Sequence, residues 1–288
     1  AIRYNRAMRE LCFDCPRSCG IDRDKNLGFC KCPNKIVVAK VIENFMWEEP
    51  CISGDKGSLA VFFSGCNLHC SFCQNYKISH SIVGREYSPK EFFELIKSYD
   101  LGKYSCIELI TPTHFSSLLI EALSIERFPI PVVWNSGGYE KPQMIERLSK
   151  VVDVFMPDLK YYSSDLSKKY SLASDYFDWA SKSLIKMRQL KKDVFKDGIM
   201  TSGLLIRHLI LPCQAKDSIK ILDFIAKEMP DTYISLMSQF TPISKEKMRK
   251  LYPLEYKLVL AYAEKLGLNK GYTQEFSSSS QDFIPNFD

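Results

Sequence analysis

The sequence predicts an α/β protein in which six β/α units form an open, partial barrel behind a small cysteine-rich segment. From residue 59 onward, short apolar runs alternate with helical patterns, as parallel βαβ units require. Polar residues follow the end of each strand-like run. Five of the eleven cysteines lie between Cys12 and Cys32, ahead of the first run.

Six apolar runs are expected to form strands, fewer than the eight of a closed TIM barrel, so the TIM-like barrel should stay open. These runs are Leu59–Phe63, Cys106–Ile110, Pro131–Trp134, Val152–Met156, Leu204–Leu211 and Thr232–Met237. The first helix should begin at Pro89, because Ser88 and Glu91 form a capping box. Later helices are expected over Phe115–Glu126, Lys141–Lys150, Tyr176–Lys192, Asp217–Lys227 and Leu254–Leu266.

The chain is expected to divide into a cysteine-rich metal-binding segment (1–50), the barrel (51–270) and a C-terminal tail (271–288). The first segment is too short to be held together by core burial alone. Within the tail, Ser277–Ser280 should form a loop.

Charge and hydropathy limit the partners and the location that we expect. The 39 basic and 34 acidic residues nearly balance, so no nucleic-acid partner is expected. The sequence has neither an apolar run of about 18 residues nor a secretory signal at its start, which predicts a cytoplasmic protein without a membrane partner.

The polar residues that follow the strands should meet in one site, because the carboxyl ends of parallel strands share one edge of the sheet. The expected cofactor-binding residues are Phe72, Asn75, Thr111, Thr113, Asn135, Ser136, Asp158, Lys160 and Arg207. His114 and His208 are candidate catalytic residues or, alternatively, hydrogen-bonded core histidines. Cys213 is a candidate hydrogen-atom donor or a small buried hydrophobe.

Three cysteines with the spacing C-x3-C-x2-C follow the first strand: Cys66, Cys70 and Cys73. Three thiolates can bind three irons of a [4Fe–4S] cubane and leave the fourth iron open. The open iron could chelate S-adenosylmethionine (SAM) through its amino and carboxylate groups. One electron would then yield methionine and a 5′-deoxyadenosyl radical, which abstracts a hydrogen atom from a substrate. The alternative is a zinc site, which needs a fourth ligand such as His69 or His80.

A second group of cysteines predicts another metal site near the start of the chain. Its four thiolates suit a second [4Fe–4S] cluster or a tetrahedral zinc, and Cys32 could take the place of Cys30 as the fourth ligand. An odd number of clustered cysteines favours bound metal over disulfides. The four expected ligands are Cys12, Cys15, Cys19 and Cys30.

Several stretches resemble the radical SAM superfamily and, within it, the pyruvate formate-lyase activating enzyme-like group, in particular its PflX-like branch. The resemblance covers roughly Cys12 to Pro285. The stretches that carry it are Cys12–Gly20, Phe62–Cys66, Cys73–Asn75, Pro157–Tyr161 and Arg207–Pro212.

The resemblance implies a partial (β/α)6 barrel with SAM at its carboxyl end. It implies SAM contacts for Asp158 and Lys160, a place near the SAM carboxylate for Arg207 and a place near SAM for Asn135. The segment Thr111–His114 departs from the group, because a Gly-Gly-Glu segment usually grips the methionine amino group there.

The expected function is therefore that of a radical SAM enzyme with a [4Fe–4S] cluster and SAM as cofactors. Its substrate would be a glycyl-radical enzyme or another protein or peptide, and its electron donor a protein such as flavodoxin or ferredoxin. The stretch Ser53–Leu59 lacks the arginine that glycyl-radical activating enzymes usually carry before the first strand, which weakens the first choice of substrate. The alternative is an iron–sulfur electron-transfer or metal-binding protein that does not cleave SAM.

Overall fold

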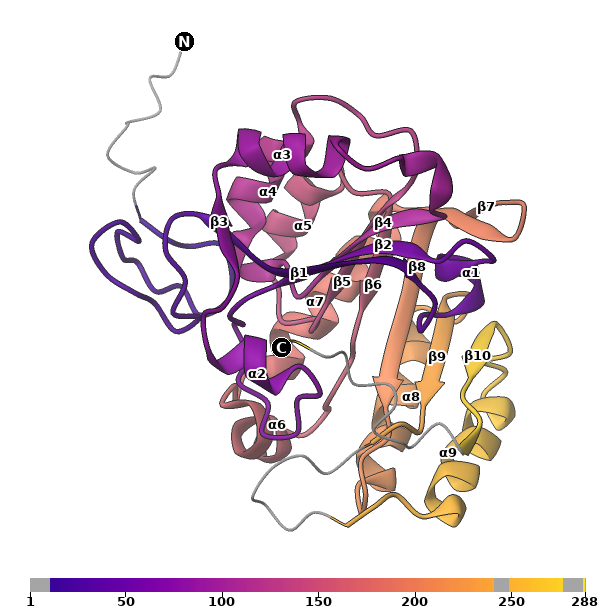
Figure 1. Cartoon of the computed structure of the whole chain (residues 1–288). Helices are drawn as coiled ribbons and strands as arrows, with labels where there is room; N and C mark the ends of the chain where they lie inside the picture. Colours follow the sequence, from indigo (N-terminus) through magenta and orange to yellow (C-terminus); the bar gives the residue numbers. More distant parts are fainter. Residues whose placement is uncertain (1–10, 241–248, 277–286, 288) are drawn as a thin grey trace.

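Six parallel strands form the centre of one ten-stranded sheet, and they are the six that the sequence predicts (Figure 1). The structure is a computed structural model that describes residues 11–240, 249–276 and 287, so the predicted loop at Ser277–Ser280 lies outside the described residues. In spatial order the strands are β2 (Ser58–Phe63), β4 (Cys106–Ile110), β5 (Val132–Ser136), β6 (Val154–Pro157), β8 (Ile199–Leu209) and β9 (Tyr233–Met237). Together with the helices they form the predicted open, partial α/β barrel.

Four further strands extend the sheet. β1 (Ile36–Phe45) pairs antiparallel with β2, and β3 (Arg85–Tyr87) pairs with β1. β7 (Val194–Lys196) pairs with β8, and β10 (Gly271–Thr273) with β9. The three-residue strands are too short to show a period in the sequence. The sheet also includes β1, whose residues belong to the predicted cysteine-rich segment.

All six predicted helices are present, with ends that shift by a few residues. Ser88 and Glu91 form the predicted capping box of α3, in which the Glu91 carboxylate accepts a 2.7 Å hydrogen bond from the Ser88 N–H. The predicted helices are α3 (Pro89–Lys97), α4 (Ser116–Leu123), α5 (Pro142–Leu148), α7 (Tyr176–Leu190), α8 (Ala215–Glu228) and α9 (Pro253–Lys265). The short elements α1 (Pro50–Ser53), α2 (Tyr76–His80), α6 (Ser164–Ser171), η2 (Leu101–Lys103) and η3 (Thr113–Phe115) are additions.

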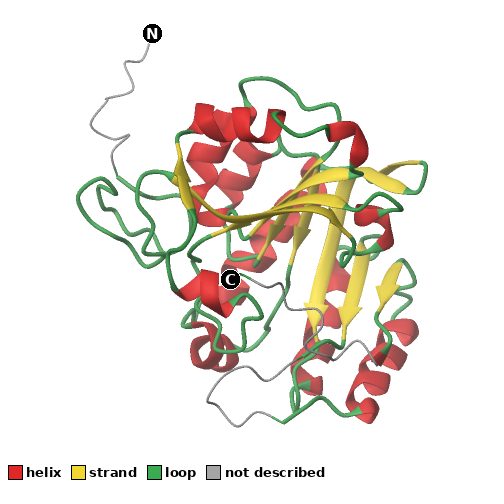
Figure 2. Ribbon diagram, viewed as in Figure 1, coloured by secondary structure: helices red, strands yellow, loops and turns green. Residues whose placement is uncertain are grey.

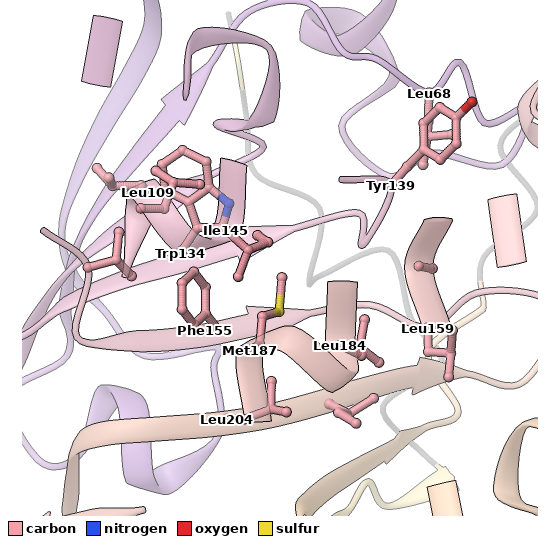
Figure 3. Close-up of a cluster of buried hydrophobic side chains, with 14 of the residues drawn as sticks. Leu68, Leu109, Trp134, Tyr139, Ile145, Phe155, Leu159, Leu184, Met187 and Leu204 are labelled. Carbon is pink, nitrogen blue, oxygen red and sulfur yellow. The ribbon is translucent and has the colours of Figure 1, made fainter. Parts of the chain in front are cut away.

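The outer face of the sheet forms the hydrophobic core. Trp134 and Phe155 are fully buried there against helix residues such as Ile145 and Met187 (Figure 3). Burying one such side chain stabilises the fold by about 1.5–3 kcal/mol. Because side chains alternate along a strand, the neighbours of these residues point to the inner face. The longer helices therefore cover the outer face, and the inner face holds the site and the short helix α1.

The inner face has an apolar lower layer and a polar upper layer. In the lower layer, Cys51 and Ile52 of α1 pack against Cys106 and Leu205 of the strands. The loop that leads into α1 brings two carboxylates, Glu48 and Glu49, to the polar layer above. The polar residues of that layer are Glu108, Asn135 and Arg207 on strands and Asp158 directly after β6.

Residues 11–35 form loops beside the barrel, without a helix or a strand of their own (Figure 2). They are attached to the barrel by specific hydrogen bonds. Asp14 accepts hydrogen bonds from the N–H and the hydroxyl of Ser117 in α4, at 3.1 and 2.7 Å. Arg17 donates from Nε to the Asn67 carbonyl at 2.9 Å. Across the described ranges, no helix has both the length and the apolarity to span a membrane.

Candidate active site

A cleft of about 1200 Å³, part of it open to solvent, lies at the carboxyl ends of the parallel strands. It contains the three cysteines of the C-x3-C-x2-C motif and every predicted cofactor-binding residue except Thr113. The predicted residues that line it are Cys66, Cys70, Cys73, Phe72, Asn75, Thr111, Asn135, Ser136, Asp158, Lys160 and Arg207.

Each cysteine sulfur of the motif has a polar neighbour. The Cys66 sulfur accepts a 3.2 Å hydrogen bond from the Leu68 N–H, and the Cys73 sulfur accepts one of 3.4 Å from the Ser79 hydroxyl. The Cys70 sulfur lies 2.9 Å from the Ser171 hydroxyl. Burial raises the pKa of Cys66 well above its usual value and that of Cys73 to about 11, so binding a metal there has to displace protons.

Within the described residues, no three Cys, His, Asp or Glu side chains meet at the position of a single metal ion. A cubane, by contrast, takes its cysteine ligands on separate irons. His69 and His80, the predicted fourth ligands of a zinc site, do not line the cleft. Their rings face each other at 4.8 Å, and His69 also stacks on Phe29 at 4.5 Å.

The floor of the cleft is a network of buried charges around Arg207. The guanidinium donates to Asp158 Oδ1 at 3.1 Å, Glu48 Oε2 at 2.6 Å and Asn135 Oδ1 at 2.7 Å. Asn135 in turn donates to Glu108 Oε1 at 2.7 Å. The protein itself therefore supplies three acceptors to Arg207, for which the resemblance implies a place near the SAM carboxylate.

The electrostatics of the floor follow from burial and pairing. Burial raises the pKa of Glu48, and the nearby Glu108 charge adds to this effect. Burial alone would also raise the pKa of Asp158, but the positive charges of Lys160 and Arg207 outweigh it and lower that pKa. The ion pairs of Asp158 with Lys160 and Arg207 thus stay charged at neutral pH.

Arg207→Leu is expected to lower the free energy of unfolding of the metal-free protein by about 3–5 kcal/mol, because it leaves the buried Glu48 carboxylate without its cation, whereas Asp158 keeps Lys160. Urea denaturation measures this loss. The double variant Arg207→Leu/Glu48→Gln should recover part of it. A variant that unfolds like the wild type would mean that Arg207 serves ligand binding alone.

The segment Thr111–His114 reaches two different places. Thr111 lines the cleft, in a left-handed conformation with φ 61°. The Thr113 hydroxyl instead donates to Glu140 at 2.8 Å, outside the cleft. His114 lines a second cavity, described below.

The other two candidate catalytic residues do not line the cleft either. His208 is buried, with its ring nitrogens 2.7 Å from the Leu159 carbonyl and 2.9 Å from the Ser218 hydroxyl, as in a hydrogen-bonded core histidine. Cys213 is exposed, so its expected alternative role as a buried hydrophobe is wrong. It lies in a turn just after β8, where its N–H donates to Glu255 at 2.7 Å.

Several residues that line the cleft are not evident from the sequence. Phe45, Trp47, Glu48 and Glu49 come from the end of β1 and the loop before α1, which fold across the inner face of the sheet. No local sequence pattern predicts that these residues reach the site, because only the tertiary structure brings them there. Glu108 gives a visible signal, since it is the one charged residue in the apolar run Cys106–Ile110.

The four predicted N-terminal ligands, Cys12, Cys15, Cys19 and Cys30, line one cavity with about 310 Å³ of empty space, part of it open to solvent. Cys32 does not line it, and its thiol donates to the Ser64 carbonyl at 3.2 Å. The structure thus brings together the four cysteines that the sequence groups.

The cavity also contains a buried guanidinium, that of Arg23, which is 7% exposed. It donates from Nη1 to the His114 carbonyl at 2.7 Å and from Nε to the Cys32 carbonyl at 3.3 Å, while its Nη2 has no partner. No carboxylate among the described residues pairs with it. A buried cation without an anion is costly, and the cysteines are the only residues lining the cavity that can become anionic. The cavity therefore fits an anionic metal–thiolate group.

Comparisons with known proteins give a family match and a relative in sequence. A family model described as the radical SAM superfamily matches residues 60–203. An uncharacterized protein of Methanocaldococcus jannaschii is 30% identical over 278 residues, which cover 91% of this chain and 76% of that protein.

Two solved structures share the fold. A radical SAM methyltransferase from Sphaerobacter thermophilus has a TM-score of 0.53 and 13% identity over 78% of this chain and 67% of its own. SuiB from Streptococcus suis, bound to SAM, has a TM-score of 0.51 and 14% identity over 79% of this chain. The match spans 49% of SuiB, about half its length.

Proposed function

The chain belongs to the radical SAM superfamily, and we propose that Cys66, Cys70 and Cys73 hold the [4Fe–4S] cluster at which it cleaves SAM. The observation that carries the assignment is their position: all three line one cleft together with the polar ends of the strands. Three cysteines leave one iron open, which is the arrangement that chelation of SAM requires.

When bound, the cluster and SAM supply a 5′-deoxyadenosyl radical that takes a hydrogen atom from the substrate. The chain's own residues position the two groups. Lys160 places a positive charge beside the cysteines, and its ion pair with Asp158 holds it there. Thr111 and Ser136 offer hydrogen bonds at the strand ends, and Phe72 forms a buried aromatic wall.

Low-temperature EPR of the reduced protein tests the binding of SAM to the open iron. We expect SAM to change the g-values of the cluster bound by Cys66, Cys70 and Cys73. A spectrum that SAM leaves unchanged in a fully loaded protein would argue for an iron–sulfur carrier that does not bind SAM.

Within the superfamily, we favour the pyruvate formate-lyase activating enzyme-like group and its PflX-like branch. The reaction would be an oxidoreductase reaction on a glycyl-radical enzyme or on another protein or peptide. The motifs between Cys12 and Pro212 support this choice. The open side of the cleft, where Trp47 is 42% exposed, leaves room for a polypeptide segment. A glycyl-radical EPR signal after anaerobic incubation with a candidate protein would support the first substrate, and its absence the second.

The N-terminal cysteines Cys12, Cys15, Cys19 and Cys30 are proposed to hold a second [4Fe–4S] cluster, and zinc is the alternative. The Arg23 guanidinium supports an anionic group in that cavity. Asn67 lines the same cavity and directly follows Cys66, so the two cysteine groups lie on either side of one short segment. This position suits a relay of electrons from a donor such as flavodoxin or ferredoxin.

Arg23→Leu is expected to lower the reduction potential of the N-terminal cluster, because a nearby positive charge stabilises the reduced, more negative form. Arg23→Lys keeps the charge and should shift the potential less. A redox titration followed by EPR in a Cys66→Ala/Cys70→Ala/Cys73→Ala background isolates this cluster. Equal potentials in the wild-type and Arg23→Leu proteins would contradict the proposed contact.

A further inference from the structure

We infer that His114 is a ligand of the N-terminal cluster, through its Nδ1 atom. The inference rests on the proposed second [4Fe–4S] cluster and adds a donor that lies far along the chain from the cysteines. His114 belongs to η3, which follows β4, and its side chain is 1% exposed.

The hydrogen bonds of His114 fix the tautomer of its ring. Nε2 lies 2.7 Å from the Ser64 carbonyl oxygen, which can only accept, so Nε2 carries the hydrogen. A second proton on the ring would place another positive charge beside the buried Arg23 guanidinium, so the ring is neutral. Nδ1 consequently presents a lone pair, and it is buried without a hydrogen-bond partner.

A buried acceptor without a partner has lost its hydrogen bonds to water without replacing them, so a group that satisfies Nδ1 is expected. His114 lines the cavity that contains the four cysteines. The Arg23 guanidinium donates Nη1 to the His114 backbone carbonyl, and its unpartnered Nη2 makes no hydrogen bond to Nδ1. A neutral imidazole whose second nitrogen donates to a backbone carbonyl is the usual arrangement of a metal-binding histidine.

The cavity offers more donor atoms than one cubane can bind. Four cysteines and His114 give five donors, one more than the four irons of a cubane take. One cysteine is then not a ligand, and we expect it to be Cys12 or Cys19, which are partly exposed, whereas Cys15 and Cys30 are buried. Replacing a thiolate with a neutral imidazole makes the cluster less negative and raises its potential, as in Rieske centres.

This role also gives a reason for the unusual segment after β4. Where related activating enzymes carry Gly-Gly-Glu, this chain has Thr111-Pro112-Thr113-His114. Thr111 reaches the SAM cleft while His114 reaches the cysteine cavity. One turn of chain would thereby connect the two metal centres.

The experiment uses the full chain with Cys66, Cys70 and Cys73 replaced by alanine, so that only the N-terminal cluster is observed. The protein is labelled with 15N-histidine and reconstituted anaerobically with iron and sulfide. The cluster is reduced chemically or by cryoreduction and studied by pulsed EPR. A strongly coupled 15N nucleus that disappears in His114→Cys, but persists in the matched buried control His208→Gln, is the expected result. His114→Cys should keep the cluster and lower its potential.

The possible results distinguish ligation by His114 from the existence of the second cluster. A protein that binds no iron and sulfide overturns the second cluster itself. A protein with four irons and no strong nitrogen coupling keeps the cluster but excludes His114 as a ligand, and would place Nδ1 on the Arg23 guanidinium. The nitrogen coupling and the reduction potential of His114→Cys are the deciding measurements, because a purely structural role of His114 would change neither.

Discussion

Cys70→Ala is expected to reduce the cleavage of SAM to the uncatalysed background. Cys70 is the central cysteine of the motif, and its sulfur lies at the wall of the cleft, 2.9 Å from the Ser171 hydroxyl. Two remaining thiolates cannot hold the cubane in place. The variant should lose the cluster of the barrel while the N-terminal centre stays loaded, which analysis of iron and sulfide can follow alongside the assay for 5′-deoxyadenosine.

Cys106→Ala provides the matched control for this variant. Cys106 is buried in the apolar lower layer of the inner face, where its thiol donates to the Ile52 carbonyl at 3.4 Å, and it does not line the cleft. The same chemical change there should leave SAM cleavage intact. If Cys70→Ala cleaves SAM as fast as the wild type, Cys70 is not a cluster ligand and the C-x3-C-x2-C motif is not required for the reaction.

Gly65→Ala is expected to destabilise the protein by at least about 2 kcal/mol and to impair loading of the cluster. Gly65 precedes the first cysteine of the motif with φ 77°, a left-handed conformation that disfavours any side chain. A Cβ atom there would lie 2.6 Å from the Cys30 carbonyl oxygen and would also overlap the Cys32 sulfur. The clash therefore falls between the barrel loop and the N-terminal cysteine segment.

Gly198→Ala is a control that measures the cost of backbone strain without the steric clash expected for Gly65→Ala. Gly198 has a similar φ of 80°, but a Cβ atom there would have nothing within 4 Å. It should cost only about 1–2 kcal/mol, the strain of the left-handed backbone. Denaturant unfolding of both variants measures the difference, and equal losses would contradict close packing of Gly65 against Cys30 and Cys32.

The fold could largely be predicted from the sequence, because its parallel strands and helices have strong periodic patterns. The capping box at Ser88 and Glu91 and the run Cys106–Ile110 were predicted to the residue. The strand Ile36–Phe45 was not predicted, since its pairing with β2 is tertiary and its half-exposed residues show no clean alternation. β7 and β10 are too short to give any period.

The candidate site divides in the same way. Residues that directly follow a strand, such as Asp158 and Thr111, could be predicted because topology alone brings strand ends together. The place of Thr113 could not be predicted, because Thr113 lies two residues beyond Thr111 in the turn and its hydroxyl points to Glu140, away from the cleft. Glu48 and Arg23 reach their sites from loops, and no local sequence pattern encodes such contacts.

The most direct test of the central claim is SAM cleavage by the wild-type protein. The protein would be reconstituted anaerobically with iron and sulfide, reduced with dithionite and given SAM, and its products quantified. We expect 5′-deoxyadenosine and methionine in equal amounts, formed only when the cluster at Cys66, Cys70 and Cys73 is loaded and reduced. If a fully loaded, reduced protein forms no 5′-deoxyadenosine, even with candidate substrates present, the protein does not cleave SAM and is an iron–sulfur protein that carries electrons.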